Sequence, residues 1–171
     1  LINTDAKIGI SALKKSTNSK AEHFSATDVA FQICPRINAA GRMDTANLAV
    51  DLLTCEDNEI AEYKAEKLNL ENTHRHEVEE KIDNDIAEIM ANDRAYQTDR
   101  VIVVAGHNYH KGVIGICAAH LVELYSKPAI VIGIDDEGNA TGSARSIDGF
   151  NIFEAISSCS DILTHFGGHP L

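Results

Sequence analysis

The sequence predicts an α/β fold in which a long connecting helix is followed by a small mixed β-sheet domain with flanking helices. A short helical remnant of another domain precedes the long helix. Residues 42–105 contain neither glycine nor proline and are rich in Ala, Glu, Lys, Leu and Ile, which predicts the helix. After residue 100 the apolar residues form short β-branched runs separated by glycine-containing turns, which predicts the sheet. The predicted divisions are residues 1–55, 56–98 and 99–171.

The first part is expected to contain short helices and too few apolar residues for a complete core. An amphipathic helix is predicted at residues 4–15. Ser25 and Asp28 carry side chains that can cap a second helix, and Pro35 is expected to end it. A third short helix should follow, capped by Asp44 or Thr45.

The long helix is predicted to run from about residue 57 to residue 92. At 1.5 Å per residue its length is about 50 Å, which is more typical of a bridge between two domains than of a helix within one. Val78, Ile82, Ile86 and Ile89 recur at steps of three and four residues and form one apolar stripe. We therefore expect this stripe to be buried and the acidic side chains to face solvent.

Three strands are predicted in the last part. Residues 101–104 form a β-branched run typical of a strand buried on both faces, and residues 129–132 form a second such run. A helix between them implies parallel pairing, whereas the short turn at residues 135–139 implies that the strand at 141–146 pairs antiparallel. A final amphipathic helix should begin at Asn151.

The charge of the chain is strongly negative but unevenly distributed. The net charge is −11, and residues 49–94 contain fourteen acidic and five basic side chains, a net charge of −9, which leaves −2 for the rest. A local cationic pocket outside the helix is therefore compatible with the composition. No apolar run is long enough to cross a bilayer and no signal peptide is present, so we expect a cytoplasmic protein without a membrane partner.

The GSARS segment at residues 142–146 is the first candidate binding motif. Strand alternation puts Ser143 and Arg145 on one face, and Ala144 and Ser146 on the other. A hydroxyl beside a guanidinium can hold one phosphate group between them. An edge strand with an ordinary exposed arginine would show the same pattern, and residue types alone do not separate the two.

Two further motifs combine glycines with a histidine. His110 begins a glycine-containing turn from a strand into a helix, the usual position of ligands in α/β folds, where Gly112 and Gly115 would let a phosphate approach backbone N–H groups. Gly167 and Gly168 are expected to end a helix in the left-handed conformation, and His169 beside them can bind a phosphate or a base. Taken alone, the turn at His110 is equally typical of a glycine-rich connection that binds no ligand.

The segment PRINAAGR at residues 35–42 is predicted to lie between two helices. It places Arg36 and Arg42 on either side of Asn38. Arg42 would then lie in the first turn of a helix, where a cation is unfavourable. Either a bound anion or a salt bridge to Asp44 would explain such a charge, and the spacing does not choose between them.

Other residues with ligand chemistry do not form a recognisable site. The four cysteines are scattered without a Cys-x-x-Cys pair, which argues against a disulfide framework or a zinc knuckle. His107 and His110 have no carboxylate beside them in sequence, and no nucleophile-elbow or Ser-His-Asp pattern occurs. We therefore expect neither catalytic residues nor metal ligands in the chain.

Four segments in the same order resemble the C-terminal half of the RecJ family of single-strand-specific DNA exonucleases, in the DHH phosphoesterase superfamily. They are PRINAAGR (35–42), YHKGVIGI (109–116), GSARS (142–146) and FGGHP (166–170). The resemblance implies that residues 1–55 are the end of a DHH catalytic domain, and that residues 99–171 are a C-terminally truncated DHH-associated domain that binds nucleic acid. Lys111 and Tyr109 depart from the family pattern, which often has proline and tryptophan there, and no Asp-His-His string occurs.

The resemblance also implies an activity for the full-length protein. The resemblance implies 5′-to-3′ hydrolysis of single-stranded DNA in repair and recombination, with Mn²⁺ or Mg²⁺ bound outside this chain and single-strand-binding protein as a partner. The residues expected to grip the substrate are Arg36, Asn38, Arg42, His110, Ser143, Arg145, Ser146, Gly167, Gly168 and His169. The alternatives are a DHH phosphodiesterase acting on short oligonucleotides or cyclic dinucleotides, and a non-catalytic nucleic-acid-binding module.

Overall fold

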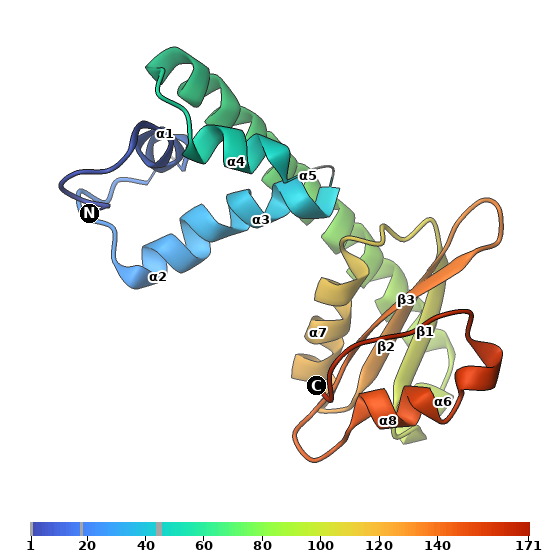
Figure 1. Ribbon diagram of the computed structural model, residues 1–171. Coiled ribbons are helices and arrows are strands. Elements are labelled where there is room, and N and C mark those ends of the chain that lie inside the picture. Colours follow the sequence, from blue (N-terminus) through green and yellow to red (C-terminus); the bar gives the residue numbers. More distant parts are fainter. Residues whose placement is uncertain (1, 18, 44–45) are drawn as a thin grey trace. The chain divides into compact units, whose positions relative to one another are not determined.

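The computed structural model describes residues 2–17, 19–43 and 46–171 (Figure 1). The chain divides into two compact units, residues 1–77 and 78–171, and one long helix contributes to both. The helices are α1 (Ile8–Ser16), α2 (Ala26–Asp28), the π-helical turn η1 (Val29–Ile33), α3 (Cys34–Met43), α4 (Asn47–Leu53), α5 (Asn58–Asn92), α6 (Ala95–Thr98), α7 (Ile114–Tyr125), α8 (Ile152–Ser157) and the 3-10 turn η2 (Ser160–Ile162). The strands are β1 (Ile102–His107), β2 (Ala129–Ile134) and β3 (Ala140–Arg145). The predicted α/β class is confirmed.

The helix that begins after Ser25 does not end at Pro35. The predicted cap is present, because Ser25 Oγ accepts from the Asp28 N–H and an Asp28 carboxylate oxygen accepts from the Ser25 N–H. α2, η1 and α3 then follow one another without a break. The Cys34 N–H donates to the carbonyl oxygen of Val29, an i to i+5 bond that widens the turn just before the proline. Pro35 thus follows a turn with altered hydrogen bonding, where a missing N–H is tolerated.

The PRINAAGR segment is helical, which corrects its predicted position between helices. It occupies α3, and Arg42 lies in the last turn of that helix. A cation stabilises the C-terminal end of a helix, so the predicted electrostatic conflict at Arg42 does not exist. The predicted caps of the next helix, Asp44 and Thr45, lie outside the described residues.

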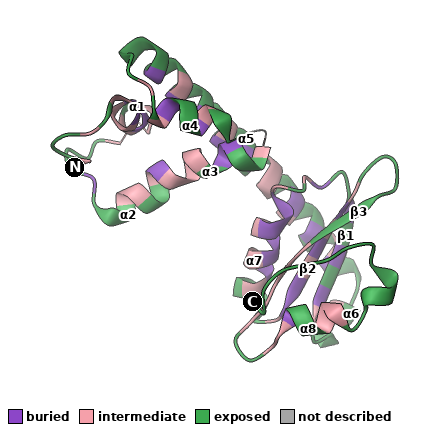
Figure 2. Ribbon diagram, viewed as in Figure 1, coloured by how far each residue is buried: buried purple, intermediate pink, exposed green. Residues whose placement is uncertain are grey.

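The first unit completes its core with side chains from α5. Leu13, Ile33 and Leu52 are fully or almost fully buried, and Ala65 and Leu68 of α5 pack into the same cluster (Figure 2). The shortage of apolar residues predicted for residues 1–55 is therefore met by the long helix. That helix spans nearly the range predicted for it, which confirms the sequence prediction.

The second unit is built on a three-stranded sheet in the order β1-β2-β3. β1 and β2 pair in parallel with Val104 opposite Val131, and β2 and β3 pair antiparallel with Val131 opposite Ser143. Both predicted directions are confirmed. α7 forms the crossover between β1 and β2 and packs along the sheet (Figure 1).

Only one face of β1 is buried, which corrects the prediction of burial on both faces. Ile102 and Val104 are buried on the face that α7 covers, whereas Val103 on the opposite face is 48% exposed. A continuous β-branched run thus does not require two covered faces, because these residues also favour an exposed strand.

The C-terminal segment contains the predicted helix but not the predicted glycine stop. Asn151 caps α8, its side-chain oxygen accepting from the Glu154 N–H. η2 ends at Ile162, and residues 163–171 are irregular, so Gly167 and Gly168 end no helix. Across the described ranges, none of the helices combines the length and apolar character that crossing a membrane requires.

Candidate nucleic-acid interface

Ser143 and Arg145 lie on the face of β3 that packs against the start of α7, as strand alternation predicts. Arg145 Nη1 donates to the carbonyl oxygen of Ala144 at 2.6 Å and lies 3.4 Å from Ser143 Oγ. Gly115 of α7 faces both side chains: a Cβ there would lie 2.8 Å from Ser143 Oγ and 3.0 Å from Arg145 Nη2. The glycine therefore lets the helix approach the strand at this point.

The guanidinium of Arg145 is a positive charge without a carboxylate partner in the described part of the chain. Its side chain is half-buried, so solvent screens its charge less than it would on an open surface. A guanidinium fork beside a hydroxyl can donate several hydrogen bonds to one phosphate group. The arrangement is chemically suited to holding an oxyanion.

His110 fixes the turn that leads into α7. Its Nδ1 accepts from the Gly112 N–H at 3.1 Å, and its carbonyl oxygen accepts from Val113 and Ile114 at 2.8 and 3.1 Å. The Gly112 N–H is thus engaged by His110 within the turn. Since Nδ1 is the acceptor, Nε2 carries the hydrogen in the neutral ring and is the atom left for a ligand.

Tyr109 anchors the same turn to α5. Its phenol donates to Asp85 Oδ2 at 2.5 Å. Its ring lies so close to Gly106 that a Cβ on that glycine would overlap the ring, and a Cβ on Gly133 would overlap the Tyr109 carbonyl oxygen. Burial raises the pKa of Tyr109, and the hydrogen bond to Asp85 acts in the same direction.

Within the described part of the chain, Arg145 forms no hydrogen bond with Ser146 or with residues 167–169. Ser146 donates from Oγ to the Phe150 carbonyl oxygen at 2.7 Å and so closes its own loop. Gly167, Gly168 and His169 are exposed, and the Pro170 carbonyl oxygen accepts from the Ile152 N–H at the start of α8. Convergence of His169 on Arg145 remains a prediction.

The other three predicted residues belong to the first unit. Arg36 is committed to local structure, since Nε donates to Asn69 Oδ1 at 2.9 Å and Nη1 to the Gln32 carbonyl oxygen at 2.5 Å. Burial lowers the pKa of Arg36. Asn38 and Arg42 are exposed and lie one helical turn apart, so they share a face of α3 that Arg36 does not.

One cluster with ligand chemistry escaped the sequence analysis. Glu79, Asp83 and His120 come together in the second unit. The spacing of Glu79 and Asp83 puts them on one face of a helix, but the many acids of α5 offer several such pairs. His120 is far away in sequence, and only the packing of α7 brings it to this pair.

Comparison with known proteins gives a matching domain family and several similar proteins. Residues 98–171 match the DHHA1 domain family. The chain is 43% identical over 166 residues to the single-stranded-DNA-specific exonuclease RecJ of Bacillus subtilis, covering 96% of this chain and 21% of that protein. It is 32% identical to the RecJ exonuclease of Haemophilus influenzae, covering 96% of this chain and 30% of that protein.

Solved structures agree with the sequence relatives. RecJ from Thermus thermophilus, crystallised in complex with Mn²⁺, matches with a TM-score of 0.83 and 29% identity, over 99% of this chain and 24% of that one. The Mg²⁺ complex of the same protein matches with a TM-score of 0.82 and 30% identity, over 99% of this chain and 25% of that one. The chain thus spans less than a third of the length of each of these relatives. The resemblance expected from the four motifs is confirmed: the chain belongs to the RecJ family, corresponds to part of such a protein, and contains its DHHA1 domain at residues 98–171.

Proposed function

We propose that the chain is the substrate-gripping part of a RecJ-like exonuclease that hydrolyses single-stranded DNA from the 5′ end in DNA repair and recombination. The full-length protein is a cytoplasmic, metal-dependent hydrolase with single-strand-binding protein as a further partner. Support comes from the RecJ relatives, each named as a single-stranded-DNA-specific exonuclease. Residues 1–55 then form the end of the DHH catalytic domain, and residues 56–98 connect it to the DHHA1 domain.

The observation that carries this proposal is the pair Ser143 and Arg145 facing Gly115. The pair offers a hydroxyl and a guanidinium that has no carboxylate partner among the described residues, in a chain whose net charge is −11. A cation kept apart from so many acids is suited to an anionic ligand such as a DNA phosphate. His110, Ser146 and residues 167–169 are proposed to complete the grip when DNA is bound.

In the first unit, Arg42 is a better candidate for phosphate contact than Arg36. Arg42 is exposed and shares its helix face with Asn38, and Arg36 is half-buried on another face of α3. A guanidinium and an amide one turn apart can both donate to a DNA backbone. We therefore assign Arg36 a supporting role and Arg42 and Asn38 a direct one.

Metal-dependent chemistry is proposed for the full-length protein and not for this chain alone. Structures of the Thermus relative contain Mn²⁺ or Mg²⁺, and paired divalent ions can activate water and stabilise a leaving oxygen. We expect the purified chain with Mn²⁺ to release no nucleotides from single-stranded DNA. Release above a metal-free control would contradict this part of the proposal.

The 35-residue helix favours an exonuclease over the alternative of a phosphodiesterase for short oligonucleotides. Smaller relatives of the superfamily generally lack so long a connection. A purely structural nucleic-acid-binding module would contain the same grip without hydrolysis. Nuclease activity of the full-length protein on long single strands would favour the exonuclease, activity on short oligonucleotides alone the phosphodiesterase, and no activity on either the binding module.

The decisive binding experiment compares Arg145→Ala with Arg100→Ala. Both remove one arginine from the second unit, and Arg100 is exposed with no hydrogen bond in the described residues. Binding of the full-length protein to 5′-phosphorylated and unphosphorylated single strands is measured across a salt series. Arg145→Ala should weaken binding by about tenfold. It should also reduce the slope of log binding constant against log salt concentration by about 0.7, which corresponds to one lost phosphate contact.

The control should bind as the unchanged protein does. Equal affinities for Arg145→Ala and the unchanged protein would remove Arg145 from the interface. An equal loss in Arg100→Ala would show that general charge, and not the Ser143–Arg145 pair, accounts for the effect. Loss confined to the 5′-phosphorylated strand would place Arg145 at the strand end.

A further inference from the structure

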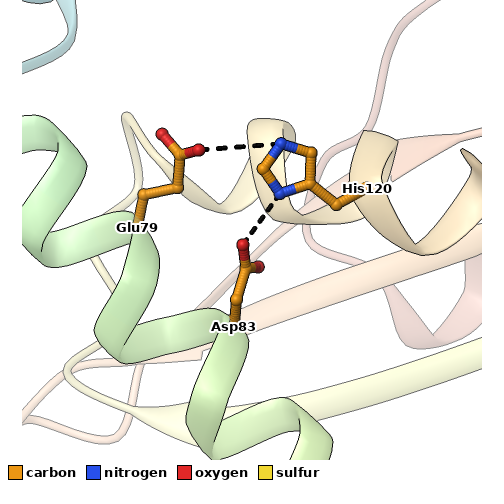
Figure 3. Close-up of side chains that lie close together, drawn as sticks. All are labelled: Glu79, Asp83 and His120. Carbon is orange, nitrogen blue, oxygen red and sulfur yellow. Dashed lines mark hydrogen bonds and ion pairs between the residues drawn. The ribbon is translucent and has the colours of Figure 1, made fainter. Parts of the chain in front are cut away.

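Glu79, Asp83 and His120 form a three-residue cluster between α5 and α7 in the second unit (Figure 3). His120 Nδ1 lies 2.8 Å from Asp83 Oδ2, and His120 Nε2 lies 3.6 Å from Glu79 Oε1. Each residue offers one ligand atom, and these three atoms all lie within 4.8 Å of one another. Figure 3 shows one ring nitrogen of His120 pointing at each of the two carboxylates.

The donor set suits a divalent transition metal. Imidazole nitrogen is a common ligand of Zn²⁺ and other first-row ions, and carboxylate oxygens also bind Mn²⁺. Two carboxylates neutralise a dication, and a neutral imidazole needs only one nitrogen for coordination. Ligand bonds of about 2.0–2.2 Å require the three atoms to close up by about an ångström, a shift within the reach of side-chain rotation.

The surroundings restrict and orient these ligands. Glu79 is only 13% exposed at its side chain, and Asp83 and His120 are 35% and 37% exposed. Cys117 is fully buried and lies one helical turn before His120 in α7, which anchors this part of the helix in the core. The Tyr109–Asp85 hydrogen bond fixes the adjacent turn of α5 to the loop before α7.

The cluster also has room for further ligands. Asp83 and His120 border an open hollow of about 320 Å³, whose other walls include Ile86 and Leu121. Three protein ligands with open positions for water are typical of accessible zinc sites. By contrast, His74 and Glu77 form a 3.7 Å pair on a single helix with side chains 60% and 70% exposed, and have no third ligand in the described residues.

We propose that Glu79, Asp83 and His120 bind a divalent transition-metal ion that ties α5 to α7. Zn²⁺ should bind more tightly than Mn²⁺, and Mg²⁺ and Ca²⁺ should bind least because imidazole is a poor ligand for them. This proposal departs from the expectation that the chain contains no metal ligands. It is independent of the proposed DNA grip, which uses the β3 face of α7.

The test is a calorimetric titration of the chain with Zn²⁺ alone, which measures the number of bound ions and their affinity. Binding should approach one ion per chain and should fall by tenfold or more in His120→Gln and in Asp83→Asn. His74→Gln is the matched control, because it removes a histidine that also faces a carboxylate. His74→Gln should leave the Zn²⁺ affinity unchanged. Co²⁺ should give visible absorption bands with the unchanged chain and with His74→Gln, but not with His120→Gln or Asp83→Asn.

A second measurement covers the case in which His120→Gln unfolds. Glu79→Gln keeps the shape of its side chain, and circular dichroism verifies its fold. Zn²⁺ should raise the melting temperature of the unchanged chain and of His74→Gln, but not of Glu79→Gln. No binding by the unchanged chain, or equal binding by the unchanged chain and the folded cluster variants, would overturn the proposal and leave the cluster as an ion-pair network.

Discussion

Ser143 lies directly against the backbone of Gly115, so the position of its hydroxyl depends on the absence of a side chain at that glycine. The same glycine faces Arg145 Nη2. One small residue in α7 thereby shapes the proposed phosphate grip on β3, and this relationship can be tested without touching either polar side chain.

Gly115→Ala should weaken DNA binding while sparing the fold. The new methyl group would displace Ser143 Oγ and Arg145 Nη2, two atoms that can move, while alanine favours the helix over glycine by up to about 1 kcal/mol. If the proposed function holds, affinity for single-stranded DNA falls about fivefold, or about 1 kcal/mol. Gly142→Ala, whose Cβ would meet its nearest atom at 3.6 Å, is the control. Unchanged binding in Gly115→Ala would show that the grip does not need this arrangement.

Tyr109→Phe should destabilise the second unit. The substitution removes the hydrogen bond to Asp85 while keeping the ring that packs on Gly106. Because Asp85 is exposed and can be hydrated instead, the expected loss is about 1 kcal/mol, below the roughly 1.5–3 kcal/mol usual for a bond to a charged group. Urea unfolding gives the free energy, and a double-mutant cycle with Asp85→Ala, which removes the acceptor, isolates the pair. A coupling free energy near zero would contradict the assignment.

Stability should fall in alkaline solution, partly through Tyr109. Its pKa is raised above the ordinary value of 10.0, so the folded chain keeps this proton at a pH where the unfolded chain has lost it. The contribution is fully present below pH 10 and decreases as the pH rises beyond it. Urea unfolding of the unchanged chain and Tyr109→Phe should therefore give free energies that converge above pH 10. Parallel curves would exclude the tyrosine as the titrating group.

Ser25→Ala should weaken the start of the helix in the first unit. It removes the side chain that accepts from the Asp28 N–H, and loss of such a cap costs about 1 kcal/mol. Hydrogen bonds from Ser25 lower the pKa of Asp28, so the stabilisation is present above pH 3.8 and is lost as the pH falls further. Thermal unfolding should show a stability difference between the two proteins at neutral pH that narrows in acid.

The long helix and the strand order follow from local sequence. The features that differ from the sequence prediction depend on tertiary context. No glycine or proline interrupts residues 42–105, so the extent of α5 was predictable. Residue types predict a helix end at Pro35, because they do not reveal the hydrogen bonding of the π-helical turn before it. The exposure of Val103 depends on which face of the sheet α7 covers, and residue preferences carry no such information.

In the candidate sites, too, some features follow from local sequence and others depend on the packing of distant elements. Strand alternation was enough to place Ser143 and Arg145 together, because the period of a strand is fixed. The approach of Gly115 to them, and the meeting of His120 with Asp83, require two elements to pack. Contacts between residues so far apart in sequence cannot be read from spacing.

The mixed sheet also has consequences for the order in which the second unit folds. β2 and β3 are joined by residues 135–139 alone, whereas β1 reaches β2 only after residues 108–128, which include α7. Closing the shorter loop costs less chain entropy, so the hairpin should form early and the parallel pair late. Stopped-flow measurements should then show that Asp135→Ala, which breaks the hydrogen bonds of the hairpin turn, slows folding, while Val104→Ala in β1 mainly speeds unfolding.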